Sequence, residues 1–165
     1  MYKIRFAGDP VLRRETRPIE QFDDSLNKMI QNMIVTMHRE DGIGLAAPQV
    51  GYSLKLCVVD ISSIDEKEHP RAFINPEIVD SWGEDTVEEG CLSIPDVRDD
   101  VTRPEGIRLV YHDERGNRLE ESYDGWMARV LQHEIDHLNG ILFVDYLPSF
   151  KIQALQQKGL LPQKF

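Results

Sequence analysis

The chain has 165 residues, the length of one domain, and carries a formal net charge of −10 at pH 7. This acidic balance argues against direct nucleic-acid specificity, because phosphate binding draws on clustered lysine and arginine. No repeat, linker or low-complexity stretch divides the sequence, and no signal peptide or membrane-spanning run is present. We therefore expect a single domain over residues 1–165 that is cytoplasmic, where a thiolate stays reduced, and does not bind membranes.

The first predicted element is a helix. Ser25 can cap this helix, and the helical pattern ends before Gly42. Its apolar residues recur at helical spacing, with methionine as core filler: Leu26, Met29, Ile30, Met33, Ile34 and Met37.

Runs typical of strands follow at about residues 54–60, 71–79, 107–112 and 118–123. A turn around Asp113–Asn117, which contains Gly116, joins the last two runs. Cys57 lies in the first run, which is apolar, and is interpreted as a buried strand residue without chemistry.

A second helix is predicted from a cap at Asp124 to Gly140. It is apolar on most of its circumference, so we expect a buried central helix. Short strands beside helices, rather than alternating with them, favour an α+β fold in which mixed or antiparallel strands pack around this helix. Asp136 on the helix is expected to pair with Arg98 or Arg103.

The same helix carries the sequence HEIDH, from His133 to His137. Histidines four apart share one helix face, so both imidazoles can bind one metal while Glu134 reaches a metal-bound water. Downstream, the only acid is Asp145, and the position of the third metzincin histidine holds Phe143. Cys91 is the leading candidate for a third ligand, because a thiolate binds zinc or ferrous iron strongly. Taken alone, HEIDH could also be a chance string on a helix, and Cys91 could also be a small buried apolar residue.

A glycine-rich segment, Gly42–Gly51, is the third motif. Its glycines and alanines remove side-chain bulk and let a backbone come close to a ligand, although a simple turn explains them too. The order of glycines matches neither the Walker phosphate loop nor the dinucleotide fingerprint, so phosphate and dinucleotide ligands are not expected.

Together the three motifs resemble the peptide deformylase family. Its signatures GxGxAAxQ, EGCLS and HExxDH correspond here to GIGLAAPQ, EGCLS and HEIDH, in that order. The segment Gly8–Arg13 is also similar to the family's opening, so the resemblance covers nearly the whole chain. The resemblance implies removal of the N-formyl group from the initiator methionine of new polypeptides, with release of formate.

By this resemblance, one divalent metal is held by three residues: Cys91, His133 and His137. Metal-bound hydroxide attacks the formyl carbon, and Glu134 is general base and then general acid. The Gln49 side-chain amide and the Leu92 backbone N–H stabilise the charge that develops on the formyl oxygen. The family typically works with Fe(II) in cells, while Zn, Ni or Co can replace it.

The resemblance also implies how the substrate binds. The peptide lies extended and pairs with backbone around Ile43, Gly44 and Gly90. The methionine side chain is expected in an apolar pocket near five residues: Ile43, Val87, Trp126, Val130 and His133. Arg129 stands beside this pocket, where many bacterial members have an aliphatic residue.

The expected partners are N-formylmethionyl peptides of nascent chains. After Asp145 the sequence has no acids but keeps three lysines: Lys151, Lys158 and Lys164. These lysines complement the end of a last helix. The alternative is a weak docking tail for the ribosome.

Two other classes of protein remain open at this point. A small endopeptidase would share HEIDH but would not require GIGLAAPQ or EGCLS. A non-catalytic metal-binding module could lack Glu134 or Gln49, and both are present.

Overall fold

The computed structural model describes every residue from Met1 to Phe165. Its helices are α1 (Asp24–Arg39), α2 (Gly125–Leu138) and α3 (Ser149–Gln157), with short 3₁₀ helices η1 (Pro10–Arg13), η2 (Ala47–Val50) and η3 (Phe143–Tyr146). The strands are β1 (Gly44–Ala46), β2 (Leu56–Val59), β3 (Arg71–Trp82), β4 (Asp85–Cys91), β5 (Ile94–Arg103), β6 (Gly106–His112) and β7 (Arg118–Asp124). The predicted α+β class is confirmed.

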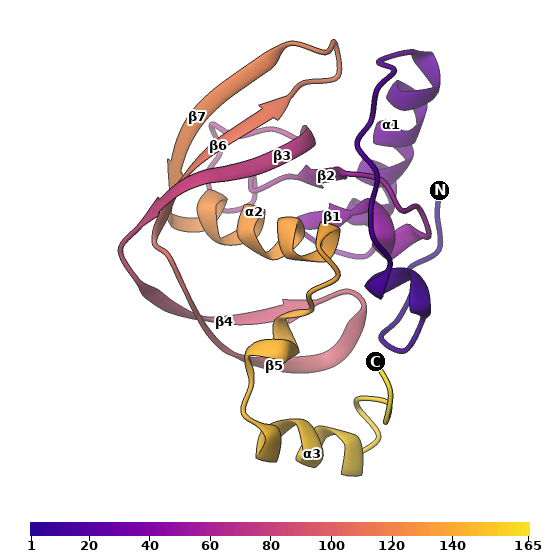
Figure 1. The fold of residues 1–165 in the computed structure, drawn as a ribbon, viewed down its shortest axis with the longest axis vertical. Coiled ribbons are helices and arrows are strands. Elements are labelled where there is room, and N and C mark those ends of the chain that lie inside the picture. Colours follow the sequence, from indigo (N-terminus) through magenta and orange to yellow (C-terminus); the bar gives the residue numbers. More distant parts are fainter.

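Helix α2 lies between two antiparallel sheets. Five strands form one sheet in the order β1-β2-β3-β6-β7, and β4 and β5 form a separate pair. Figure 1 shows α2 crossing between the larger sheet and this pair, with α3 at the far end of the molecule. Every residue of α2 from Met127 to Ile135 is buried, so the prediction of a central buried helix is confirmed. Trp126, near the start of α2, is an exception to this burial, because 46% of its surface is exposed.

Strand β2 is buried on both faces because helices cover both sides of the sheet. Alternate residues of a strand point to opposite faces. Accordingly, Cys57 and Val59 belong to the core cluster with α2, whereas Leu56 and Val58 belong to the cluster with α1. The interpretation of Cys57 as a buried strand residue is confirmed, since its side chain is fully enclosed.

Helix α1 begins earlier than predicted. Asp23, not Ser25, is the N-cap, and its carboxylate accepts a hydrogen bond from the Leu26 backbone N–H at 3.0 Å. Ser25 lies within the first turn. Both residue types can cap, and the aspartate two positions upstream satisfies the free N–H groups of that turn.

Three strands were not among the predicted elements: β1, β4 and β5. In β4 and β5, exposed charged residues such as the Glu88–Asp100 pair stand among buried ones, so the segments lack an apolar run. The turn at Asp113–Asn117 is confirmed, with Gly116 at φ +85°. Asp124 directly precedes α2 as predicted, but its side chain makes no capping hydrogen bond.

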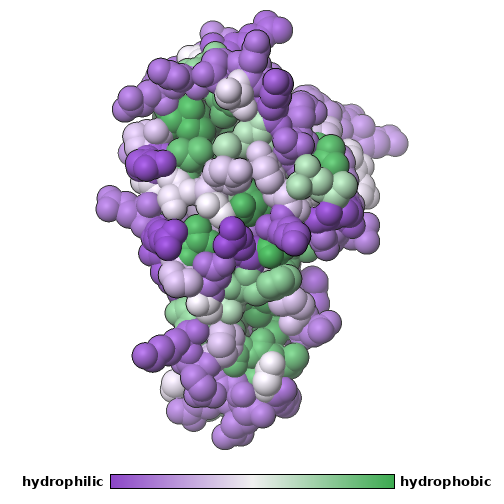
Figure 2. Space-filling model, turned by 90° about the vertical axis from the view of Figure 1, so that its right-hand side faces the viewer, coloured by the Kyte–Doolittle hydropathy of each residue, from purple (hydrophilic) through white to green (hydrophobic).

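The surface is strongly polar between apolar patches. Figure 2 shows apolar side chains lying in recesses among projecting charged side chains, both on the broad part of this face and on the narrower part below it. None of the helices combines the length and apolar character that crossing a bilayer requires.

Candidate active site

Three potential metal-binding side chains meet between α2 and the end of β4. Cys91 is the last residue of β4, and His133 and His137 lie one turn apart on α2. Their donor atoms all lie within 4.8 Å of one another, and Cys91 Sγ is 3.3 Å from His137 Nε2. One thiolate and two imidazoles form a donor set that suits zinc or ferrous iron and leaves a coordination position free for catalysis.

The hydrogen bonding of His133 fits a metal at this place. Its Nδ1 hydrogen-bonds to Glu89 Oε1 at 2.9 Å, so Nε2 remains for a metal ion. Metal-binding histidines almost always have such a partner for the second ring nitrogen. Burial disfavours charge on His133, yet hydrogen bonds with Cys91 and Glu89 raise its pKa well above the usual value. Because a metal competes with protons for these lone pairs, its binding here should weaken as the pH falls.

His137 has the opposite electrostatic environment. Complete burial, followed by the charge of neighbouring His133, lowers the pKa of His137 well below its usual value. The two imidazoles lie edge to face, with ring centres 5.1 Å apart. A neutral His137 is the form that offers a lone pair to a metal.

Glu89 is the centre of a buried charge network that the sequence analysis did not single out. Its carboxylate accepts hydrogen bonds from Arg103 at 2.6 and 2.9 Å and from Arg129 at 2.7 Å, in addition to the contact with His133. Burial alone would raise the pKa of Glu89, but these hydrogen bonds hold it far below its usual value. The carboxylate therefore stays ionised. Its place directly before Gly90-Cys91 was the only sequence signal for this role.

Arg103 extends the network to α2. Its Nη1 donates to Asp136 Oδ2 at 2.8 Å, so the expected pairing of Asp136 with Arg103 is confirmed. The alternative, a pairing of Asp136 with Arg98, is wrong, because Arg98 binds Glu88 at the surface at 2.9 Å.

Glu134 follows His133 on α2 and is almost completely buried. One carboxylate oxygen, Oε1, is buried and has no hydrogen-bond partner. Burial raises the pKa of Glu134 to about 7. A carboxyl group with a pKa near neutrality can accept and return a proton at the pH of a cell.

Two glycines make room for this arrangement. A Cβ on Gly44 would collide with Glu134 Oε2 and lie 2.8 Å from Val130 Cγ1. A Cβ on Gly42 would lie 2.9 Å from the end of the Leu92 side chain. The small residues of the glycine-rich segment therefore permit β1 to approach α2 and the turn after Cys91.

Gln49, in η2, is held in a fixed orientation. Its Oε1 accepts from the Ala46 backbone N–H at 2.9 Å, and its Nε2 donates to Ser93 Oγ at 3.1 Å and approaches Cys91 Sγ at 3.5 Å. The amide therefore directs its N–H groups towards the cysteine. Leu92 directly follows Cys91 in the turn between β4 and β5 and is half-buried.

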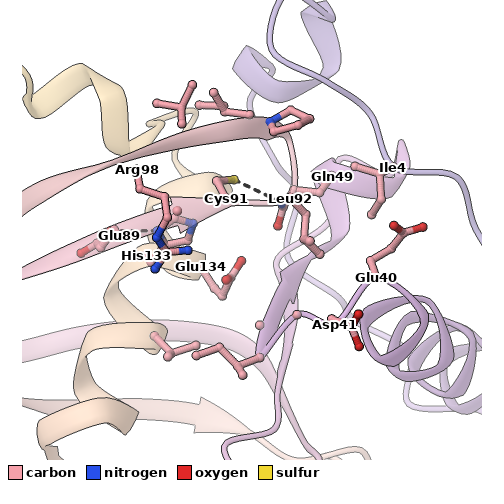
Figure 3. Close-up of a pocket in the computed structure, with 18 of the residues that line it drawn as sticks. Ile4, Glu40, Asp41, Gln49, Glu89, Cys91, Leu92, Arg98, His133 and Glu134 are labelled. Carbon is pink, nitrogen blue, oxygen red and sulfur yellow. Dashed lines mark hydrogen bonds and ion pairs between the residues drawn. The ribbon is translucent and has the colours of Figure 1, made fainter. Parts of the chain in front are cut away.

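A pocket of about 1020 Å³ opens in front of these groups. Figure 3 shows Glu134, His133 and Cys91 on one side of it, Gln49 beside the cysteine, and Glu40 and Asp41 at the end of α1 on the other side. Six of the seven residues expected to bind substrate line the pocket: Ile43, Gly44, Gly90, Trp126, Arg129 and Val130. Val87 and His137 are not among the lining residues. The lining residues that the sequence did not indicate include Ile4, Phe6 and Ile64, because no motif marks them.

The guanidinium of Arg129 is turned towards the smaller sheet. It donates to Glu89 Oε2, to the Val101 carbonyl at 2.9 Å and to the Asp85 carbonyl at 2.8 Å. Only 6% of the residue's surface is exposed. Its charge is therefore neutralised within the protein.

The downstream alternative for a third ligand, Asp145, is not supported. Asp145 accepts hydrogen bonds from Arg13 at 2.7 and 3.0 Å and caps the Leu142 backbone N–H. Phe143 is fully buried and stacks on His133, with ring centres 6.1 Å apart. It supports the histidine by packing.

Known proteins with similar sequences and similar folds belong to one family. The family model described as polypeptide deformylase matches residues 1–153. The chain is 46% identical over 159 residues to the peptide deformylase of Thermotoga maritima, covering 96% of this chain and 94% of that protein. It is 52% identical over 156 residues to that of Chlorobaculum parvum, covering 93% and 83%. Among solved structures, peptide deformylase from Synechococcus elongatus in complex with actinonin has a TM-score of 0.91 at 44% identity, covering 98% of this chain and 90% of that one.

Proposed function

This chain belongs to the polypeptide deformylase family, and we propose that it removes the N-formyl group from the initiator methionine of newly made polypeptides and releases formate. The observation that carries the proposal is Glu134, a buried carboxyl with a free oxygen and a pKa of about 7, beside the Cys91, His133 and His137 cluster and facing a large pocket. The domain proposed for this reaction spans residues 1–165.

Cys91, His133 and His137 would hold one divalent metal ion. When bound, such an ion acts as a Lewis acid towards the formyl oxygen and makes a water molecule easier to deprotonate. We propose Fe(II) as the ion in the cell, with Zn, Ni or Co as possible replacements.

Glu134 moves the proton. In the first step its carboxylate would take a proton from the attacking water, and in the second it would give this proton to the departing amine, which must leave as a neutral group. A pKa of about 7 allows one carboxyl group to serve both steps, since neither protonation state is strongly disfavoured near neutral pH.

Gln49 and Leu92 would stabilise the developing oxyanion. The Gln49 amide is oriented by Ala46 and Ser93 before any substrate arrives, which limits the reorganisation needed in the transition state. The Leu92 backbone N–H lies in the turn next to Cys91. Removing one such donor typically costs about 3 to 4 kcal/mol of transition-state stabilisation.

The free edge of the larger sheet favours an extended peptide substrate. β1 is the terminal strand, paired only with β2, and Gly44 is its first residue. A peptide that added to this edge would lie along the pocket between β1 and Gly90 of β4. We propose that the side chain of its first residue enters the part of the pocket near Ile43, Trp126 and Val130.

The role of the lysine-rich tail stays a prediction. Lys151 donates to Asp99 of β5 at 2.9 Å, which favours a structural role for this lysine. Ribosome association through the other two tail lysines can be tested by co-sedimentation of a Lys158→Ser/Lys164→Ser variant; unchanged co-sedimentation would discard it.

The function is tested by release of formate from formyl-Met-Ala-Ser by protein purified without oxygen and loaded with Fe(II). We expect formate from this peptide and no cleavage of an unformylated peptide of the same sequence. Cleavage inside the unformylated peptide would instead support the small endopeptidase.

A further inference from the structure

Tyr146 contacts the charge network of the site from the outside. It is the last residue of η3, and its hydroxyl donates to Asp136 Oδ2 at 2.7 Å. The same oxygen accepts from Arg103 Nη1 at 2.8 Å. The guanidinium of Arg103 also lies over the Tyr146 ring, 5.0 Å from its centre. Tyr146 thus contacts both members of the Arg103–Asp136 ion pair.

This ion pair leads directly to His133. Arg103 donates through Nε and Nη2 to Glu89, and Glu89 Oε1 hydrogen-bonds to His133 Nδ1. The side chains of Arg103 and Glu89 are only 5% and 6% exposed. Hydrogen bonds in such a low-dielectric environment are strong and mutually dependent, so a change at one end of the chain alters the geometry at the other.

We propose that Tyr146 is a positioning residue for the metal site, acting on the orientation of the His133 ring through Asp136, Arg103 and Glu89. The inference rests on the proposed role of His133 as a metal ligand. Tyr146 does not line the pocket and lies outside the three motifs, so it has no direct contact through which to act on a substrate.

The phenol is suited to a fixed donor role. Partial burial, followed by the hydrogen bond to Asp136, raises the pKa of Tyr146 to about 12. The hydroxyl therefore keeps its proton at neutral pH and donates to Asp136 throughout the working range. Replacement by phenylalanine keeps the ring over Arg103 and removes only this hydrogen bond.

A second tyrosine supplies a matched control. The hydroxyl of Tyr123 donates to Glu121 and accepts from Arg71 at 2.8 Å, a cluster that also joins a tyrosine, a carboxylate and an arginine. None of the hydrogen bonds in that cluster involves Cys91, His133 or His137. Tyr123→Phe therefore removes a comparable hydrogen bond without touching the proposed metal site.

The experiment compares Co(II)-loaded parent, Tyr146→Phe and Tyr123→Phe proteins. Changing a direct partner of a ligand typically lowers metal affinity about 10- to 100-fold, and for the more remote Tyr146 we expect metal release to a chelator about 3- to 10-fold faster. The visible Co(II) spectrum should shift, and kcat should fall while KM stays within about twofold of the parent. Tyr123→Phe should leave all three unchanged. Equal metal release and identical spectra for Tyr146→Phe and the parent would overturn the proposal.

A double-mutant cycle tests the route of the effect. In an Asp136→Ala background, Tyr146→Phe should cause little further change in the rate of metal release, because the acceptor that links Tyr146 to Arg103 is already gone. Fully additive effects would overturn the proposed chain of contacts. Metal release and the Co(II) spectra can be measured without a substrate. A parent protein that releases no formate would therefore refute the proposed function, while the Co(II) data would still test the role of Tyr146.

Discussion

Gly44 lies so close to Glu134 that a single methyl group on Gly44 would overlap the carboxylate oxygen Oε2. The first residue of β1 and the proposed acid/base on α2 are therefore in contact only because one of them has no side chain. This contact places the carboxyl group at the edge of the pocket while excluding solvent from behind it.

Gly44→Ala should displace the Glu134 carboxylate or push β1 away from α2. Either movement changes the position of the proposed acid/base by a few tenths of an ångström or more, and we expect kcat to fall by about 100-fold. Gly42→Ala is the comparison, because the one close contact of its Cβ would be with the flexible end of Leu92, and it should cause a smaller loss. Steady-state kinetics with a formylated peptide measures kcat for both variants. Equal losses of kcat would show that the Gly44–Glu134 contact has no special role.

Glu89→Gln should destabilise the protein and weaken metal binding. The change leaves Arg129 buried without a counter-charge and leaves Arg103 with Asp136 as its one carboxylate partner. Leaving a buried charge without its partner typically costs about 3 to 5 kcal/mol. Loss of the carboxylate partner of His133 should lower metal affinity by about 10- to 100-fold. Denaturant unfolding and metal titration measure the two effects.

The neighbouring residue provides the control for this substitution. Glu88 pairs with Arg98 at the surface, where side chains are 60% and 63% exposed. Such a pair contributes about 0 to 1 kcal/mol, so Glu88→Gln should unfold almost as the parent does. A similar destabilisation by both variants would argue against the buried network.

Glu121 should contribute to loss of stability in acid. Although burial raises its pKa, hydrogen bonds from Tyr123, Tyr111 and Arg71 lower it below the usual value. A carboxyl group with a lowered pKa stabilises the fold above its unfolded pKa of about 4.3, and this contribution is lost as the pH falls through the folded value. In metal-free protein, Glu121→Gln should therefore reduce the drop in the denaturant midpoint between pH 7 and about pH 3.

The control for the pH experiment is Glu120→Gln. Glu120 is an exposed neighbour that lies 3.5 Å from Arg108. Its substitution should leave the pH dependence of the midpoint close to that of the parent. The idea fails if Glu121→Gln shows the same acid sensitivity as the parent.

The shape of the pocket predicts a preference for the first residue of the substrate. Formyl-Met and formyl-norleucine peptides should be turned over at similar kcat/KM, because both side chains fill an apolar pocket. A formyl-Ala peptide should be slower by about 10- to 200-fold, the effect typical of missing apolar atoms in such a pocket. Equal kcat/KM for all three peptides would mean that the region near Ile43, Trp126 and Val130 does not hold the side chain.

The central helix could be predicted well, because its apolar residues and its two histidines all recur at the spacing of an α-helix. The sequence also predicted strands at the positions of β2, β3, β6 and β7. It did not predict β4 and β5, because they present charged residues such as Glu88 and Asp100 to solvent and are held by pairing with each other. The position of the helix start at Asp23 depended on a choice between two nearby capping residues that only the tertiary structure resolves.

The side chains that support the candidate site were harder to predict than those within the motifs. Glu89 and Arg103 are 14 residues apart in sequence and meet only because β4 and β5 pair antiparallel. Ile4 and Phe6 reach the pocket through the path of the N-terminal segment, which no periodic pattern indicates. Contacts of this kind follow from topology, and their residues look ordinary in the sequence.

The most direct measurement is formate release from formyl-Met-Ala-Ser by Fe(II)-loaded parent protein and a Glu134→Gln variant of equal metal content. Glutamine keeps the size of the side chain but cannot take up the proton. The account predicts release by the parent and a loss of at least about 100-fold in the variant. A variant that keeps the parent's rate, or a fully metal-loaded parent that releases no formate, would contradict the central claim.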